Sequence, residues 1–145
     1  MTQEDKELLL VDLCARLPYG VFINFEKTHN IFPLASIKME EMFPLNDFQV
    51  LLNDEYPIQW CKPYLRPISS MTEKEEKELE KITSLFNFNR LENIIYVGNQ
   101  DDGFCFLKEM EEIITFLNAH YFDYRGLIER GLALEALEGM YNLKD

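Results

Sequence analysis

The sequence predicts an α+β fold, with a small antiparallel sheet or SH3-like partial barrel in the N-terminal half and a helix-rich C-terminal half. Two observations predict it. Short runs of apolar, β-branched and aromatic residues fill positions 20–61 and are separated by turn residues, which is typical of strands joined by hairpins. Apolar residues then recur at helical spacing in 73–86 and 110–117. The 145 residues suit one domain or two very small ones.

The first predicted helix covers residues 4–17. Thr2 is a suitable N-cap because its hydroxyl can accept a hydrogen bond from a backbone N–H, and apolar residues recur at helical spacing from Leu9 onward. Pro18 and Gly20 end the helix, since proline has no N–H and glycine accepts a positive φ.

About four short strands should follow and form one antiparallel sheet, with the first helix over one open end. Pro33 favours an edge position for the second strand, because proline cannot donate to a ladder. Segment 40–47 contains Pro44 and Asn46 and is interpreted as a loop, and Asn53-Asp54-Glu55 indicates a second hairpin. The expected strands are 21–25, 31–39, 48–52 and 56–60.

Residues 62–72 are interpreted as an extended crossover. Pro63 and Pro67 stiffen it and argue against a helix or an inner strand. The crossover divides the chain into a helix plus small sheet at 1–61 and a helical or mixed half at 73–145, which we expect to pack as one unit.

A surface helix is predicted over 73–86. Ser70 with Glu73, or Thr72 with Glu75, forms a capping box, in which each residue of the pair bonds the backbone N–H of the other. The apolar stripe of this helix consists of Leu79, Ile82 and Phe86. Residues 87–90 should break the helix, and a strand at 94–97 could pair with 104–106.

A third helix carries Met110, Ile113, Ile114 and Leu117 on one apolar face and ends near His120. Asp123 is a suitable cap for a further short helix, 124–130, with Gly131 as its C′ residue.

Between these two helices lies an aromatic joint, which we define as Tyr121, Phe122 and Tyr124. We expect Phe122 to be deeply buried because it has no polar group to satisfy. The tyrosine hydroxyls are expected at the surface beside Arg125.

Three sequence blocks together resemble a family of short uncharacterised proteins from gut Bacteroidetes bacteria and their phages or prophages. The blocks are Leu8-Leu-Leu-Val-Asp-Leu-Cys-Ala-Arg-Leu-Pro-Tyr-Gly-Val21, Cys61-Lys-Pro-Tyr-Leu-Arg-Pro-Ile-Ser-Ser-Met-Thr-Glu73 and Phe122-Asp-Tyr-Arg-Gly-Leu-Ile-Glu-Arg-Gly-Leu-Ala-Leu-Glu-Ala136. They cover roughly a third of the chain. Where such relatives often have proline after Ala136, this chain has Leu137. The resemblance implies a phage or mobile-element context and transfers no active site.

The net charge and the cysteines limit the kinds of partner and the cellular compartment to be expected. The formal net charge of −12 repels a phosphate backbone, which disfavours direct nucleic-acid binding but leaves a basic protein partner or nucleic-acid mimicry open. Cys14, Cys61 and Cys105 are odd in number and far apart, as expected of buried, reduced thiols in a cytoplasmic protein. The N-terminus has acidic residues where a signal peptide is basic, and no apolar stretch is long enough to span a membrane.

His120 and Asp123 form the one candidate pair for metal-dependent or hydrolytic chemistry, since an i, i+3 spacing can bring two ligands together. The structural alternative is that the ring packs on the joint while the aspartate caps the next turn, and it is favoured because the chain has only two histidines. We therefore predict no catalytic, metal or cofactor site.

Five residues combine aromatic and basic character and are candidates for contacts with a partner: Tyr64, Arg66, Tyr121, Tyr124 and Arg125. The alternative is that each arginine pairs with a nearby carboxylate while the tyrosines pack. The sequence thus favours a non-catalytic interaction or accessory protein of a phage or mobile element, acting on a host or phage protein. A small enzyme using His120 and Asp123, an acidic nucleic-acid mimic and a homo-oligomer remain open.

Overall fold

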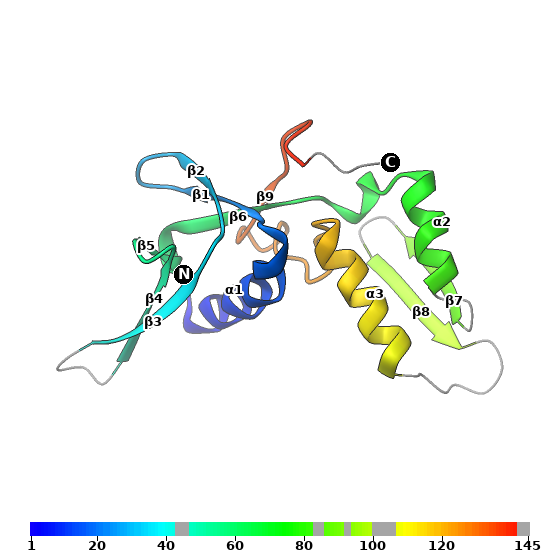
Figure 1. Ribbon diagram of the computed structural model, residues 1–145, viewed down its shortest axis with the longest axis horizontal. Helices are drawn as coiled ribbons and strands as arrows, with labels where there is room; N and C mark the ends of the chain where they lie inside the picture. Colours follow the sequence, from blue (N-terminus) through cyan, green and yellow to red (C-terminus); the bar gives the residue numbers. More distant parts are fainter. Residues whose placement is uncertain (43–46, 83–85, 92–93, 100–106, 142–145) are drawn as a thin grey trace.

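The computed structural model describes residues 1–42, 47–82, 86–91, 94–99 and 107–141 (Figure 1). It confirms the α+β fold, with sheet concentrated in the N-terminal half. The helices are α1 (Gln3–Arg16), α2 (Glu73–Ile82) and α3 (Leu107–Ala119). The strands are β1 (Phe22–Phe25), β2 (Asn30–Pro33), β3 (Ile37–Met42), β4 (Asp47–Leu52), β5 (Tyr56–Pro57), β6 (Cys61–Leu65), β7 (Phe86–Leu91), β8 (Ile94–Asn99) and β9 (Leu134–Glu135).

Helix α1 begins and ends as its sequence predicts. The Thr2 side chain accepts a hydrogen bond from the backbone N–H of Asp5 at 3.1 Å, so Thr2 is the N-cap. A 3-10 turn, Leu17–Tyr19, follows the helix, and Gly20 has a φ of 67°, the left-handed conformation that glycine favours. The buried face of α1 includes Leu9 and packs on strands of two sheets.

The first sheet has the strand order β2-β1-β6-β9, with β1 antiparallel to β2 and β6, and β6 parallel to β9. The prediction that residues 62–72 contain no inner strand is therefore wrong, because β6 lies between β1 and β9. Pro63 is tolerated there because β9 pairs only with Tyr64 and Leu65. On the β9 side the missing N–H of Pro63 thus interrupts no ladder.

The predicted return strand, 31–39, is split between two sheets. Its first part is β2, which lies at the edge as Pro33 indicated, and its second part belongs to β3. Asn53 holds the corner between them. Its side-chain oxygen accepts hydrogen bonds from the backbone N–H groups of Ala35 (2.8 Å) and Ser36 (3.2 Å), and its nitrogen donates to the carbonyl oxygen of Pro33 at 3.0 Å.

The second sheet has the order β3-β4-β5, so the four strands expected in one sheet belong to two. Strand β3 continues to Met42 and β4 starts at Asp47, so both ends of the loop predicted at 40–47 belong to strands, and its residues 43–46 lie outside the described part of the chain. The hairpin predicted around Asn53–Glu55 is confirmed, since β4 and β5 are antiparallel. Ile58–Trp60, expected as strand, forms a 3-10 turn.

Helix α2 starts with the predicted capping box, of which Thr72 and Glu75 are the members. The Glu75 N–H donates to the Thr72 hydroxyl at 3.2 Å, and the Thr72 N–H donates to the Glu75 carboxylate at 3.0 Å. Phe86, predicted as the end of the helical stripe, instead opens β7.

Strand β8 was expected to pair with residues 104–106, which lie outside the described part of the chain. The strand beside β8 is β7, in an antiparallel hairpin. The predicted break at 87–90 is therefore a strand. Phe86 and Phe88 alternate with Asn87 and Asn89, which is a strand pattern, but asparagine is rare in strands and common in turns, so the segment was interpreted as a break.

Helix α3 ends at Ala119, close to the predicted end near His120, but its inner face is rotated. Ile113 and Leu117 are buried as expected, whereas Ile114 is 39% exposed and Phe116 is buried in its place. Phe122 is fully buried, as predicted.

The short helix predicted at 124–130 does not form, because Gly126 with a φ of 75° interrupts the right-handed helical path. A single turn remains at 127–130. Gly131 still closes it as a C′ residue: the Gly131 N–H donates to the carbonyl oxygen of Ile128 at 3.1 Å, and the Leu132 N–H donates to that of Leu127 at 2.9 Å.

Two clusters of buried apolar side chains follow this architecture. One joins α1 to both N-terminal sheets and includes Leu127 and Leu132 from the C-terminal segment. The other joins α2, α3 and Phe122, and these helices lie at the opposite end of the molecule from the β3–β4 ribbon (Figure 1). Within the described residues, no helix is both long and apolar enough to cross a bilayer.

Candidate functional site

Arg66 connects the aromatic joint to α2 by hydrogen bonds from both its main chain and its side chain. Its backbone N–H donates to the carbonyl oxygen of Tyr121 at 2.7 Å, and its carbonyl oxygen accepts from the N–H of Asp123 at 2.8 Å. The guanidinium donates two hydrogen bonds to Glu75, at 2.7 and 2.8 Å, and lies 4.3 Å from the centre of the Phe122 ring. Main chain and side chain of one residue thus hold α2 and the joint together.

Electrostatics around Glu75 favour its charged form. Burial alone would raise the pKa of this carboxyl group, but the hydrogen bonds from Arg66 and Thr72 outweigh burial, so the pKa lies below its usual value. A carboxylate that accepts several N–H and O–H donors is stabilised as an anion. The ion pair between Arg66 and Glu75 therefore stabilises the contact between α2 and the aromatic joint.

A second cluster of charges joins α1 to the joint. Arg16 and Asp12 are fully buried, and Arg16 Nε donates to Asp12 at 2.9 Å while Arg16 Nη2 donates to the carbonyl oxygen of Phe122 at 2.7 Å. Arg125 donates to the other Asp12 oxygen at 2.7 Å. Both guanidinium groups also lie over the ring of Tyr124, at 5.5 and 4.5 Å from its centre.

The hydroxyl groups of Tyr121 and Tyr124 were expected at the surface. They instead make hydrogen bonds within the chain. Tyr121 donates to the carbonyl oxygen of Tyr19 at 2.6 Å, and Tyr124 donates to Asn118 at 3.0 Å. Tyr64 is buried, and its hydroxyl accepts from Asn24 at 2.9 Å.

All five residues predicted for partner contact therefore have internal roles. The alternative, in which arginines pair with carboxylates and tyrosines pack, describes this geometry. Arg125, whose side chain is 20% exposed, remains accessible at the edge of the joint.

His120 and Asp123 are not brought together as a ligand or acid–base pair. The His120 Nδ1 contacts the carbonyl oxygen of Phe116 at 2.9 Å, and the imidazole stacks on the Phe116 ring. Asp123 accepts the backbone N–H groups of Leu127 and Ile128, one on each carboxylate oxygen, at 2.9 Å. Across the described residues there is no group of three or more potential metal ligands.

The cysteines differ in their surroundings. Cys61 is buried, donates to the carbonyl oxygen of Pro57 at 3.3 Å, and has its pKa raised to about 12 by burial and the nearby charge of Glu26. Cys14 was expected to be buried as well, but it lies on the exposed face of α1. Cys105 lies outside the described residues.

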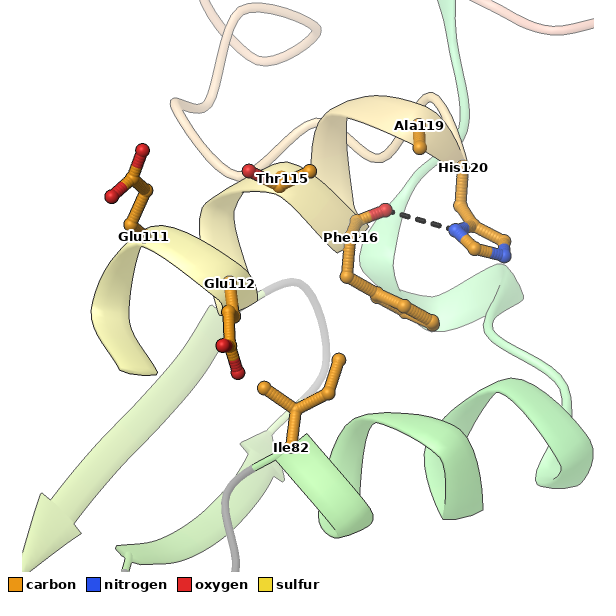
Figure 2. A pocket seen from close by; sticks show the side chains of 7 residues that line it. All are labelled: Ile82, Glu111, Glu112, Thr115, Phe116, Ala119 and His120. Atoms are coloured by element: carbon orange, nitrogen blue, oxygen red, sulfur yellow. Dashed lines mark hydrogen bonds between the residues drawn. The ribbon is translucent and has the colours of Figure 1, made fainter. Parts of the chain in front are cut away.

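A pocket of about 500 Å³ lies between the end of α2 and the side of α3 that faces it (Figure 2). Ile82 of α2 points toward it from one side, and Phe116 and His120 border it from α3 (Figure 2). Its seven lining residues are Ile82, Glu111, Glu112, Thr115, Phe116, Ala119 and His120. Of these, only His120 was a functional candidate from the sequence, because the pocket depends on how two helices approach each other; Ile82 was predicted only as part of the apolar stripe of its helix.

The pocket combines an apolar floor with a negatively charged border. Ile82, Phe116 and Ala119 supply the apolar surface, while Glu111 and Glu112 are exposed beside it. The surrounding helices have the same sign of charge: α2 carries five glutamates and three lysines, and α3 carries three glutamates and one lysine. Such a site suits an apolar group with neighbouring positive charge.

Comparisons of the chain with protein-family models, curated proteins and solved structures gave no match.

Proposed function

We propose that the protein is a non-catalytic interaction protein whose α2–α3 pocket binds a segment of another protein that carries an apolar side chain flanked by basic residues. The pocket with its apolar floor and acidic border is the observation that carries this proposal. A phenylalanine or leucine side chain entering it would be desolvated against Ile82 and Phe116. Lysine or arginine residues beside that anchor would face Glu111 and Glu112.

The resemblance of three sequence blocks to short proteins of gut Bacteroidetes and their phages supports a phage or mobile-element setting. The partner we propose is then a host or phage protein in the cytoplasm, and no cofactor takes part. The net charge of −12 supports a basic partner segment over an acidic one, because long-range attraction increases the rate of encounter.

Binding can be tested with two synthetic amphipathic helical peptides that share one leucine face and differ only in lysine or glutamate on the other face. The lysine peptide should bind with measurable heat in titration calorimetry and shift the amide resonances of α2 and α3. The glutamate peptide should not bind. Equal binding of both peptides, or shifts confined to other elements, would contradict the proposal.

Matched variants separate local from overall charge. Glu111→Lys/Glu112→Lys should weaken binding of the lysine peptide about tenfold or more, since two attractive contacts become repulsive. Glu129→Lys/Glu138→Lys makes the same change in net charge at exposed positions of the C-terminal segment and should have a smaller effect. A protein captured from host cells supports the proposal only if the first variant loses it and the second retains it.

Blocking the pocket provides an independent test. Thr115→Trp introduces a large side chain at an exposed lining position and should prevent binding. Val11→Trp places the same residue on the exposed face of α1 and should leave binding unchanged.

A further inference from the structure

The outer edge of β3 is a surface that the pocket does not involve. Strand β3 is the terminal strand of its sheet, with β4 on one side only. Within the described part of the chain, residues 37–42 make no backbone hydrogen bonds other than those to β4. Figure 1 shows the β3–β4 ribbon extending away from α2 and α3, and most side chains of β3 are exposed.

The side chains of β3 are unusual for such an edge. Met39 is 56% exposed, although its cross-strand partner is the buried Val50. Met42, on the opposite face of the strand, is 39% exposed. The apolar face of the ribbon therefore begins in the core and continues into solvent. A face of this kind is a candidate contact surface.

The charges on β3 alternate in a way that complements a second copy of the same strand. Lys38 and Glu40 share the opposite face from Met39 and form an exposed ion pair at 3.0 Å. If two β3 strands pair antiparallel about a twofold axis at Met39, Lys38 of each copy lies opposite Glu40 of the other. Centring the axis one residue away places Lys38 or Glu40 against its own copy, which is repulsive.

We propose that β3 pairs with β3 of a second copy, in antiparallel register about Met39, to join two three-stranded sheets into one six-stranded sheet. The contact is isologous, so it closes as a dimer and does not propagate. Backbone hydrogen bonds supply much of the attraction, the two symmetry-related Lys38–Glu40 contacts set the register, and the Met39 side chains meet at the axis. This inference is independent of the proposed pocket function.

Charge reversal tests the register. In sedimentation velocity, wild-type protein should show a concentration-dependent monomer–dimer equilibrium. Lys38→Glu or Glu40→Lys alone should weaken it about tenfold, because each converts two attractive contacts into repulsive ones. The double variant Lys38→Glu/Glu40→Lys should restore the wild-type equilibrium. Circular dichroism should show the same fold for all variants, since these side chains are exposed.

Cross-linking tests the axis. Met39→Cys in a Cys14→Ser/Cys105→Ser background should form an intermolecular disulfide on mild oxidation, because the two thiols face each other across the axis. Ile31→Cys, an exposed position on the edge strand β2, should cross-link far less. A protein that remains monomeric at every concentration overturns the proposal, as does a dimer indifferent to the charge reversals or one disrupted only by Glu111→Lys/Glu112→Lys.

Discussion

Arg66 and Glu75 form a bidentate ion pair, with Nη1 of Arg66 2.7 Å from one carboxylate oxygen and Nη2 2.8 Å from the other. Both side chains are largely buried. The same guanidinium also donates to the carbonyl oxygen of His120 at 3.2 Å. The planar donor geometry of arginine is needed here because two carboxylate oxygens from α2 and one carbonyl oxygen from the end of α3 accept from it at once.

Arg66→Lys should therefore destabilise the protein although it keeps the charge. An ammonium group cannot donate in the same planar pattern to Glu75 and His120, and it loses the contact with the Phe122 ring. We expect a loss of about 2 kcal/mol in the free energy of unfolding for Arg66→Lys and about 3–5 kcal/mol for Arg66→Ala, which leaves Glu75 buried without its cation. Urea unfolding measures both. A lysine variant as stable as wild type would mean that charge alone suffices.

The same ion pair predicts how stability depends on pH. The pKa of Glu75 is lower in the folded protein than in the unfolded chain, so its contribution is fully present above the unfolded value of about 4.3 and is lost as pH falls through the folded pKa. Urea unfolding between neutral pH and pH 3 should show this loss in wild type. Glu75→Gln should show a shallower loss, whereas Glu73→Gln, an exposed position in the same turn, should follow wild type.

Truncation of Phe122 tests the role of the aromatic joint. Its fully buried ring packs against α2 and α3, so Phe122→Ala should cost about 3–5 kcal/mol and lower Tm sharply. Ile114→Ala removes a side chain that is 39% exposed on α3 and should cost much less. Thermal unfolding followed by circular dichroism compares them. If Phe122→Ala had the same Tm as wild type, the aromatic joint would not stabilise the packing of α2 and α3.

Asp12 should be energetically coupled to Arg125. Asp12→Ala leaves buried Arg16 and partly exposed Arg125 without a shared carboxylate, so we expect a loss of about 3–5 kcal/mol. Arg125→Ala should cost about 1 kcal/mol, because its side chain is 20% exposed and Arg16 still neutralises Asp12. In a double-mutant cycle the two losses should not add. Strict additivity would mean that the contact between Asp12 and Arg125 contributes nothing measurable.

Features with local causes were predictable from the sequence. The Thr2 cap, the capping box of Thr72 and Glu75, and the closing Gly131 each depend on hydrogen bonds within a few residues. The burial of Phe122 followed from its chemistry, since a large apolar ring next to a helix end has to pack.

Features that depend on distant residues were not predictable. Pro63 argued against an inner strand, yet β6 is accommodated between β1 and a β9 that reaches only Tyr64 and Leu65. Tyr121 has a φ of 64°, an unfavourable conformation for a tyrosine, and its ring centre lies 3.7 Å from that of Tyr141 in the C-terminal segment, a stacked pair with no motif behind it. Periodicity carries no information about such pairings. The pocket was missed because it depends on how α2 and α3 approach each other: Ile82 was placed only in the apolar stripe of its helix, and Thr115 belongs to no motif.

Strand β9 has a consequence for the order of events during synthesis. The first sheet starts at Phe22, but its last strand is Leu134–Glu135, and the Tyr141 hydroxyl both accepts from the Phe22 N–H and donates to the carbonyl oxygen of Tyr64. A nascent chain that has emerged only as far as β6 still exposes the side of that strand which β9 will cover. Completion of this sheet must therefore wait until Leu134 and Glu135 have been made, and the contacts of the Tyr141 hydroxyl form later still. Until then the emerging N-terminal half is a candidate for chaperone binding.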